Sequence, residues 1–391
     1  MDVTGVTFSF FLIFTGAAVF ASLALYTRQP LIIAYIALGA VIGPYGFSLV
    51  TDLRLLSDIG HVGIIFLLFL LGLDMQPQAL WSTLRKSTFV ALISSALFMA
   101  LGMAVAIGFG FSLVDSLIIG AAMMFSSTII GIKLLPTTVL HHRHIGELMI
   151  GLLLLQDLIA ILVLMVLFSG ASNDTQEMGM QLGMSLLSLP ILVVSALLIV
   201  RYILLPLIAR FDRFHEYIFL LALGWCLGLA ETAKLCGLSE EIGAFIAGIT
   251  IATSPISQYI AVNLRPLRDF FLILFFFAVG AQFDFTMLGQ VLAPALVLSA
   301  MVLALKPVVY RFLLKGVSEK RSLAWDLGFR LGQASEFSLL IAYVAVANAM
   351  ISQQASLLIQ ATTIITLLVS SYIVVLNYPT PIAISDRLRR D

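Results

Sequence analysis

The chain has 391 residues, of which 61% are hydrophobic and 11% are charged, and its mean hydropathy is +1.10. Soluble domains carry about a quarter charged residues, so the composition predicts an integral membrane protein with little mass outside the bilayer. Basic and acidic residues number 21 each, which leaves no basic excess for binding nucleic acid. The two cysteines, Cys226 and Cys236, form neither a disulfide framework nor a metal site.

A transmembrane helix needs about 20 predominantly apolar residues. The sequence therefore predicts an all-α polytopic membrane protein with thirteen transmembrane helices, near residues 6–27, 30–48, 58–76, 87–110, 113–135, 145–170, 180–207, 214–237, 239–255, 267–285, 288–314, 325–348 and 354–378. Four of these spans are imperfect. The second and the ninth are short and end in Gly43-Pro44 and Ser254-Pro255, and small polar residues interrupt the fifth and the twelfth.

The distribution of basic residues supports this count and predicts the orientation. Loops after odd-numbered spans hold nearly all lysines and arginines, whereas loops after even-numbered spans hold only Arg54 and Lys234. Lys306 and Arg330 lie within spans. The positive-inside rule then places the N-terminus outside the cell and the C-terminus in the cytoplasm.

Three short motifs recur in the same order about 210 residues apart. They are Ala34-Tyr35-Ile36-Ala37 with Ala244-Phe245-Ile246-Ala247, Leu68 to Asp74 with Phe275 to Asp284, and Ser126-Ser127 with Ser335-Glu336. The offset corresponds to seven spans, an odd number, so the second copy is inverted. We expect repeat one at 6–170, a connector span at 180–207 and repeat two at 214–378. Inverted repeats with interrupted helices indicate a secondary transporter with its site near the membrane midplane, rather than an enzyme.

Asp157 is the candidate carrier residue, because it lies in a run that is otherwise apolar from Ile150 to Phe168 apart from Gln156. An ionised carboxylate at this depth costs several kcal/mol unless a counter-charge, water or a cation offsets it. A proton or a metal cation can each neutralise it, and this permits exchange of one for the other. The alternative is an aspartate paired permanently with a basic residue.

The interrupted spans supply further oxygen ligands. Ser126, Ser127 and Thr128 break span five, and Gly332, Gln333 and Ser335 break span twelve. Two half-helices would offer carbonyl oxygens to a cation and amide groups to an acid. We therefore predict a potassium or sodium site at Asp157, with the Gln156 amide and the three hydroxyls as partners. The alternative role of the hydroxyl residues is to ease close helix packing.

Two further charged residues lie near this expected site. Lys306 in span eleven must pair or lose its proton, and its expected partners are Asp157 and Glu336; the alternative is snorkelling to the cytoplasmic surface. We expect Glu336 to be structural. Because Gln156 cannot ionise, the site has one titratable carboxylate at this pair, which predicts electroneutral one-for-one exchange.

The motifs together resemble the cation:proton antiporter superfamily, and most closely its Kef-type potassium:proton branch. The resemblance extends over nearly the whole chain, through Gly43-Pro44-Tyr45-Gly46, Leu67 to Pro77, Ser126-Ser127-Thr128, Gln156-Asp157, Gly237-Leu238-Ser239 with Gly243 to Gly248, Phe275 to Gly280, Lys306, and Gly332 to Phe337. It implies a multi-pass homodimer in the bacterial inner membrane. Spans 1–3 and 8–10 would form its interface part, and spans 4–6 and 11–13 a core that moves as an elevator.

The resemblance also implies crossed discontinuous helices at spans five and twelve. The glutamine that precedes the aspartate, Gln156, resembles the residue found at this position in potassium-handling members of the superfamily. No cofactor and no soluble domain is expected within residues 1–391, although Kef-type proteins usually continue into a nucleotide-binding regulatory domain. The acidic loop of glutathione-gated members is not matched at Ser257 to Pro266. Sodium:proton exchange, an ion channel and a sodium-coupled symporter of organic anions remain the alternatives.

Overall fold

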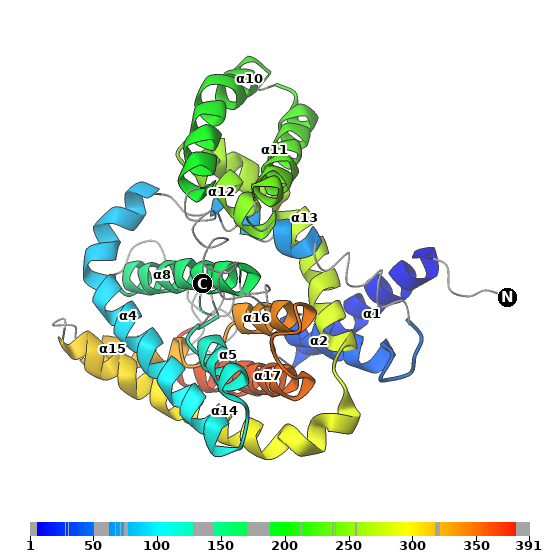
Figure 1. The fold of residues 1–391 in the computed structure, drawn as a ribbon, viewed down its shortest axis with the longest axis vertical. Coiled ribbons are helices and arrows are strands. Elements are labelled where there is room, and N and C mark those ends of the chain that lie inside the picture. Colours follow the sequence, from blue (N-terminus) through cyan, green and yellow to red (C-terminus); the bar gives the residue numbers. More distant parts are fainter. Residues whose placement is uncertain are drawn as a thin grey trace. The chain divides into compact units, whose positions relative to one another are not determined.

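The computed structural model describes residues 6–27, 29, 31–50, 62–66, 68–70, 72–73, 77–127, 131, 144–169, 188–211, 213–236, 238, 240–254, 256–316 and 321–380. These residues form helices joined by turns (Figure 1). The helices include α1 (Val6–Tyr26), α2 (Leu31–Ile42), α4 (Pro77–Gly108), α5 (Leu113–Met123), α8 (His144–Ser169), the π-helical segment η1 (Val200–Leu204), α10 (Leu205–Arg210), α11 (His215–Leu235), α12 (Glu240–Ala252), α13 (Ile256–Ala281), α14 (Phe285–Gly316), α15 (Arg321–Arg330), α16 (Glu336–Ala347) and α17 (Gln353–Asn377).

Among the described residues, six helical stretches are long and apolar enough to cross a membrane. They are Thr7–Tyr26, Thr88–Gly108, Ser188–Arg210, Glu216–Leu235, Phe285–Gly316 and Gln353–Asn377. Shorter apolar helices include α2, α5 and α16. The predicted all-helical membrane fold is confirmed, and the count of thirteen spans stays a prediction because several expected spans run over undescribed residues.

Surface side chains explain why these helices belong in a membrane. On α1, Val19, Leu23 and Leu25 are each more than 60% exposed. Exposed apolar side chains along a whole helix are stable in hydrocarbon, where the helix also satisfies its own backbone hydrogen bonds. The exposed apolar side chains therefore agree with the prediction of a multi-pass membrane protein.

The chain folds into two compact units. The first contains Met1–Thr51, Trp81–Leu164 and Val279–Asp391, and the second contains Asp52–Leu80 and Met165–Ala278. Within the first unit, α5, α16 and α17 contact one another, and α17 also packs along α14 (Figure 1). Within the second unit, α11 packs on α12.

Each unit contains a close backbone contact at the repeated motifs. In the first unit, a Cβ atom on Gly280 would lie 2.0 Å from the Ile36 carbonyl oxygen of α2. In the second unit, a Cβ atom on Gly72 would lie 2.5 Å from the Phe245 carbonyl oxygen of α12. Gly72 and Gly280 are at corresponding positions of the two predicted copies, as are α2 and α12. Within each unit, a glycine of one predicted copy thus lies against the short helix of the other, and the inverted repeat itself stays a prediction.

Candidate functional site

The first part of the candidate site is the segment that follows α5. Ser112 begins the helix by accepting a hydrogen bond from the Asp115 amide at 3.0 Å, which is a typical N-cap. The helix ends at Met123, and residues 124–127, here called the first break, are not helical. Ser126 and Ser127 are buried in this break, while Thr128 lies outside the described residues.

The second part is the interruption between α15 and α16, at residues 331–335, here called the second break. Ser335 caps α16, since its hydroxyl accepts from the Phe337 amide at 3.2 Å and its own amide donates to the Ser338 hydroxyl at 3.3 Å. The Ala334 amide donates to the Thr366 hydroxyl of α17 at 3.1 Å. These bonds satisfy the amide groups that an interrupted helix exposes.

Direct hydrogen bonds connect the two breaks. The Ser126 hydroxyl donates to the Leu331 carbonyl oxygen at 2.8 Å. The Ser338 hydroxyl donates to the Ala122 carbonyl oxygen near the end of α5. The structure therefore brings the polar segments of spans five and twelve together, in the buried interior of the first unit.

Lys306 of α14 lies at this junction and is fully buried. Its ammonium donates to the carbonyl oxygens of Phe125 at 2.6 Å and Gln333 at 2.9 Å, one from each break. A longer contact reaches the Ser126 hydroxyl at 3.3 Å, and the ammonium lies 5.3 Å from the centroid of the Phe98 ring. Carbonyls just beyond helix C-termini carry partial negative charge, and an aromatic face attracts a cation, so these contacts offset part of the cost of burying an ammonium ion.

The oxygens that accept from Lys306 in the described structure are all neutral. The expected pairing of Lys306 with Asp157 or Glu336 is not among these contacts and stays a prediction. Glu336 is 5% exposed and lies in the first turn of α16. A negative charge is stabilised at that end of a helix.

Gln156 of α8 holds the first break in place through its side-chain amide. Its Oε1 accepts from the Ser126 backbone amide at 3.0 Å, and its Nε2 donates to the Tyr310 hydroxyl at 2.6 Å. Tyr310 lies one turn beyond Lys306 on α14 and is also fully buried. Each polar group of the Gln156 side chain therefore has a partner in the protein.

Asp157 follows Gln156 on α8, and its side chain is 1% exposed. This is the buried carboxylate that the sequence predicts, and it is adjacent in the chain to a residue bonded to the first break.

In the second break, Gln333 is fully buried and its Oε1 accepts from the Ser370 hydroxyl at 2.9 Å. Among the described residues, the Gln333 Nε2 has no hydrogen-bond partner. Gly332 lies in the same break, and its Cβ would be 3.5 Å from Pro307 of α14.

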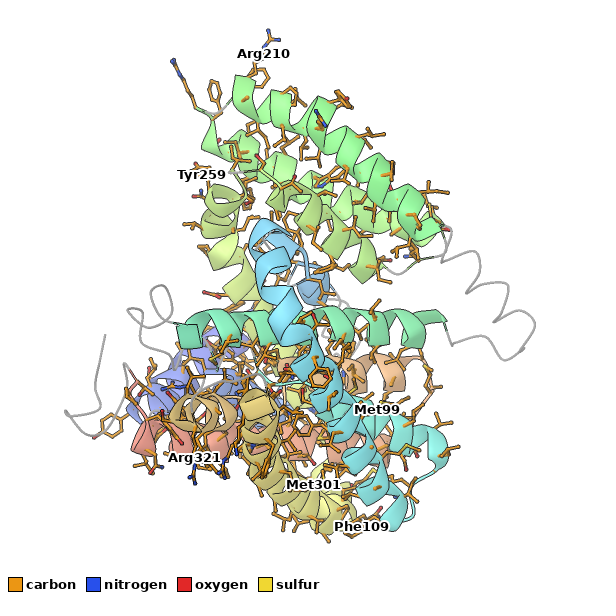
Figure 2. All side chains as sticks on the ribbon, turned by 90° about the vertical axis from the view of Figure 1, so that its left-hand side faces the viewer. Met99, Phe109, Arg210, Tyr259, Met301 and Arg321 are labelled. Carbon is orange, nitrogen blue, oxygen red and sulfur yellow. The ribbon has the colours of Figure 1, made fainter. Side chains whose placement is uncertain are left out.

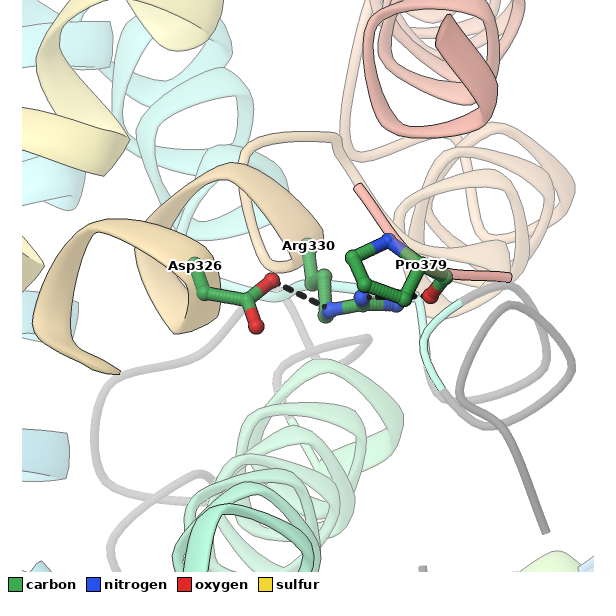
Figure 3. A network of polar contacts seen from close by, with 3 residues as sticks. All are labelled: Asp326, Arg330 and Pro379. Atoms are coloured by element: carbon green, nitrogen blue, oxygen red, sulfur yellow. Dashed lines mark hydrogen bonds and ion pairs between the residues drawn. The ribbon is translucent and has the colours of Figure 1, made fainter. Parts of the chain in front are cut away.

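A second buried cation, Arg330, lies at the end of α15, directly before the second break. Its Nε donates to Asp326 at 2.7 Å, and a terminal nitrogen donates to the Pro379 carbonyl oxygen at 2.9 Å (Figure 3). The guanidinium also lies 5.8 Å from the Tyr378 ring centroid. Arg330 thus ties the end of α15 to the chain that leaves α17.

Sequence reasoning missed several participants in this site, among them Phe98, Tyr310 and Thr366. Tyr310 carried a usable signal, because a residue four positions after Lys306 shares its helix face. Phe98 lies in an apolar run without any distinguishing feature. Among the described residues, no group of three or more His, Cys, Asp and Glu side chains could hold a metal ion.

Comparison with known proteins establishes the family. A model of the family described as "Sodium/hydrogen exchanger, transmembrane" matches residues 10–376. The chain belongs to this family. The expected resemblance to cation:proton antiporters is therefore confirmed, and the protein is a membrane transporter of the antiporter class.

Two individual proteins and one solved structure show how similar this chain is to its relatives. The chain is 28% identical to the iron transporter MagA of Paramagnetospirillum magneticum over 88% of this chain and 79% of the relative. It is 29% identical to K(+) efflux antiporter 4 of Arabidopsis thaliana, covering 87% of this chain but only 58% of that protein. The fold matches the sodium proton antiporter MjNhaP1 of Methanocaldococcus jannaschii, with a TM-score of 0.71, 17% identity, and coverage of 95% of this chain and 99% of that one.

Proposed function

We propose that this exchanger performs electroneutral potassium:proton antiport, with Asp157 as the residue that binds a proton and a potassium ion in turn. The observation that carries the proposal is a carboxylate that is 1% exposed and adjacent in the chain to Gln156, whose amide is bonded to the first break. A buried carboxylate must be neutralised by a proton, a cation or a basic partner. The similarity to a potassium efflux antiporter favours potassium as the cation.

The contacts of the two neighbouring residues support a one-for-one stoichiometry. Gln156 carries no charge, and its side chain is already bonded to Ser126 and Tyr310. Lys306 donates to neutral carbonyl oxygens of both breaks, so its ammonium holds the two breaks together. Asp157 is then the group whose charge changes when a proton replaces a cation. One proton exchanged for one monovalent cation moves no net charge.

The movement that exposes the site would be an elevator motion of a core made of spans 4–6 and 11–13 against an interface part made of spans 1–3 and 8–10. The breaks would lie in crossed half-helices, with Ser127 and Thr128 as additional oxygen ligands of the cation. The protein would act as a homodimer in the bacterial inner membrane, with its N-terminus outside and its C-terminus in the cytoplasm. Support comes from the family membership, the inverted repeat and the positions of the basic residues.

A flux measurement tests this function. Proteoliposomes with an internal pH dye are challenged with potassium, sodium, lithium or ferrous ions, the last because one relative bears the name of an iron transporter. We expect potassium to drive proton movement without current, and Asp157→Asn to abolish it. The matched control is Asp284→Asn, because Asp284 accepts from the Thr286 amide at 2.8 Å and asparagine can keep that bond.

Each other outcome identifies a competing function. A preference for sodium would make the protein a sodium:proton antiporter, which is the main alternative. A steady potassium current without proton movement would indicate a channel. Full potassium:proton exchange by Asp157→Asn would remove Asp157 from the carrier role.

A further inference from the structure

The second unit contains an open groove beside the turn between α10 and α11. It consists of two hollows of about 410 Å³ and 620 Å³ that share Glu216 and Leu220 as lining residues. The larger hollow is also lined by Arg213 and three aromatic residues: Phe211, Phe214 and Tyr217. The smaller one continues along α11 and the first part of α13, where its lining is mostly apolar.

The ends of two membrane-crossing stretches place this groove at a membrane surface. Ser188–Arg210 ends and Glu216–Leu235 begins on either side of the turn. Figure 2 shows Arg210 at the tip of this helical bundle and Tyr259 on its side. Aromatic and basic side chains are enriched at such a level, between the headgroups and the hydrocarbon. The groove thus runs from the headgroup level towards the hydrocarbon.

Two opposite charges line the groove without being paired with each other. Arg213 is exposed, and Glu216 lies in the first turn of α11, three positions further along the chain. In the described part of the chain, neither side chain has an ion pair. A wholly anionic ligand would meet the Glu216 carboxylate, and a wholly cationic one would meet Arg213. The charges fit a ligand that carries a negative and a positive group close together.

We propose that this groove binds a zwitterionic phospholipid with a primary ammonium headgroup, phosphatidylethanolamine. The phosphate binds Arg213, since a guanidinium donates two parallel hydrogen bonds to phosphate oxygens. The headgroup ammonium donates to Glu216. One acyl chain lies along the apolar wall formed by Leu220, Ile218, Ile260 and Leu264. Phosphatidylcholine carries a quaternary ammonium without a donor hydrogen, so it cannot make the second contact.

Lipid titration of the purified, delipidated protein tests the proposal. Apparent affinity is measured from the shift in thermal unfolding as phosphatidylethanolamine, phosphatidylcholine or phosphatidylglycerol with identical acyl chains is added in detergent. We expect about tenfold tighter binding of phosphatidylethanolamine than of phosphatidylcholine, which corresponds to about 1.4 kcal/mol for one charge-assisted contact. Glu216→Gln should bring phosphatidylethanolamine down to the affinity of phosphatidylcholine, and Arg213→Gln should weaken binding of all three lipids.

The control is Glu231→Gln, an exposed glutamate near the other end of α11, which should leave the lipid preference unchanged. Equal affinities for the three lipids, or a preference that survives Glu216→Gln, would overturn the proposal. A dimer whose contact covers the groove, detected by cross-linking from Leu220→Cys and insensitive to added lipid, would assign the groove to a second copy instead. None of these readouts depends on transport activity.

Discussion

Replacing Lys306 with methionine removes the cation that joins the two breaks while keeping a side chain of similar length. Three acceptors lose a donor: the carbonyl oxygens of Phe125 and Gln333 and the hydroxyl of Ser126. In the fully buried site of Lys306, nothing in the described structure replaces the missing donors. The two carbonyl oxygens, which lay 2.6 Å and 2.9 Å from the same ammonium, are then left close together near the ends of interrupted helices, where both carry partial negative charge.

The size of the effect follows from two opposing contributions. A hydrogen bond to a charged group contributes about 1.5–3 kcal/mol, so the two short bonds at 2.6 Å and 2.9 Å contribute about 3–6 kcal/mol together. Methionine avoids part of the several kcal/mol that burying an ammonium costs. We therefore expect a net loss of about 2–4 kcal/mol in the free energy of unfolding.

Thermal unfolding of the detergent-purified protein measures this loss, which should lower the midpoint by about 2–5 °C for a chain of 391 residues. Lys315→Met, an exposed site at the end of the same helix, is the control and should leave the midpoint unchanged. Lys306→Ala removes the atoms of n-propylammonium, so adding this ion should restore part of the lost stability, whereas n-propanol should not. A Lys306→Met midpoint equal to that of wild type, or equal rescue by n-propanol, would refute the reasoning.

Three further substitutions and one control test local packing by thermal unfolding. Gln156→Leu leaves the Ser126 amide without its acceptor, which should cost about 1–3 kcal/mol, while the Tyr310 hydroxyl keeps its bonds to the Ser126 and Ser94 side chains; an unchanged midpoint would mean that water replaces the lost bond. Gly280→Ala brings a Cβ to 2.0 Å from a backbone oxygen and should cost about 1–3 kcal/mol, whereas Gly224→Ala has open space and should gain about 0.4–1 kcal/mol. Arg330→Gln should cost about 1–3 kcal/mol through its lost bonds to Asp326 and Pro379, and equal stability would show that α15 is held by other contacts.

The sequence predicted the polar segments of the site because their composition is unusual for a membrane span. Ser126-Ser127 and Gly332 to Ser335 weaken a helix, since glycine costs conformational entropy and serine competes for backbone hydrogen bonds. Asp157 was identifiable because a carboxylate within an apolar run is costly to bury and usually serves transport. The chain leaves helical conformation at both polar segments and buries Asp157.

The partners of these residues could not be predicted, because they are set by packing between distant segments. The oxygens that accept from Lys306 are carbonyls of Phe125 and Gln333, and backbone carbonyls carry no signal in the sequence. Electrostatic reasoning alone favoured a carboxylate partner for Lys306. The hydrogen bond from Ala334 to Thr366 likewise depends on how α17 lies beside the second break.

The most direct test of the shared carrier is the number of protons released when potassium binds. The purified protein is titrated with potassium chloride in weakly buffered detergent solution, and released protons are counted with a pH dye while bound potassium is measured in parallel. If one carboxylate binds both ions in turn, about one proton leaves for each potassium bound, and Asp157→Asn releases none. Potassium binding without proton release in the wild type, or undiminished release from Asp157→Asn, would contradict the account.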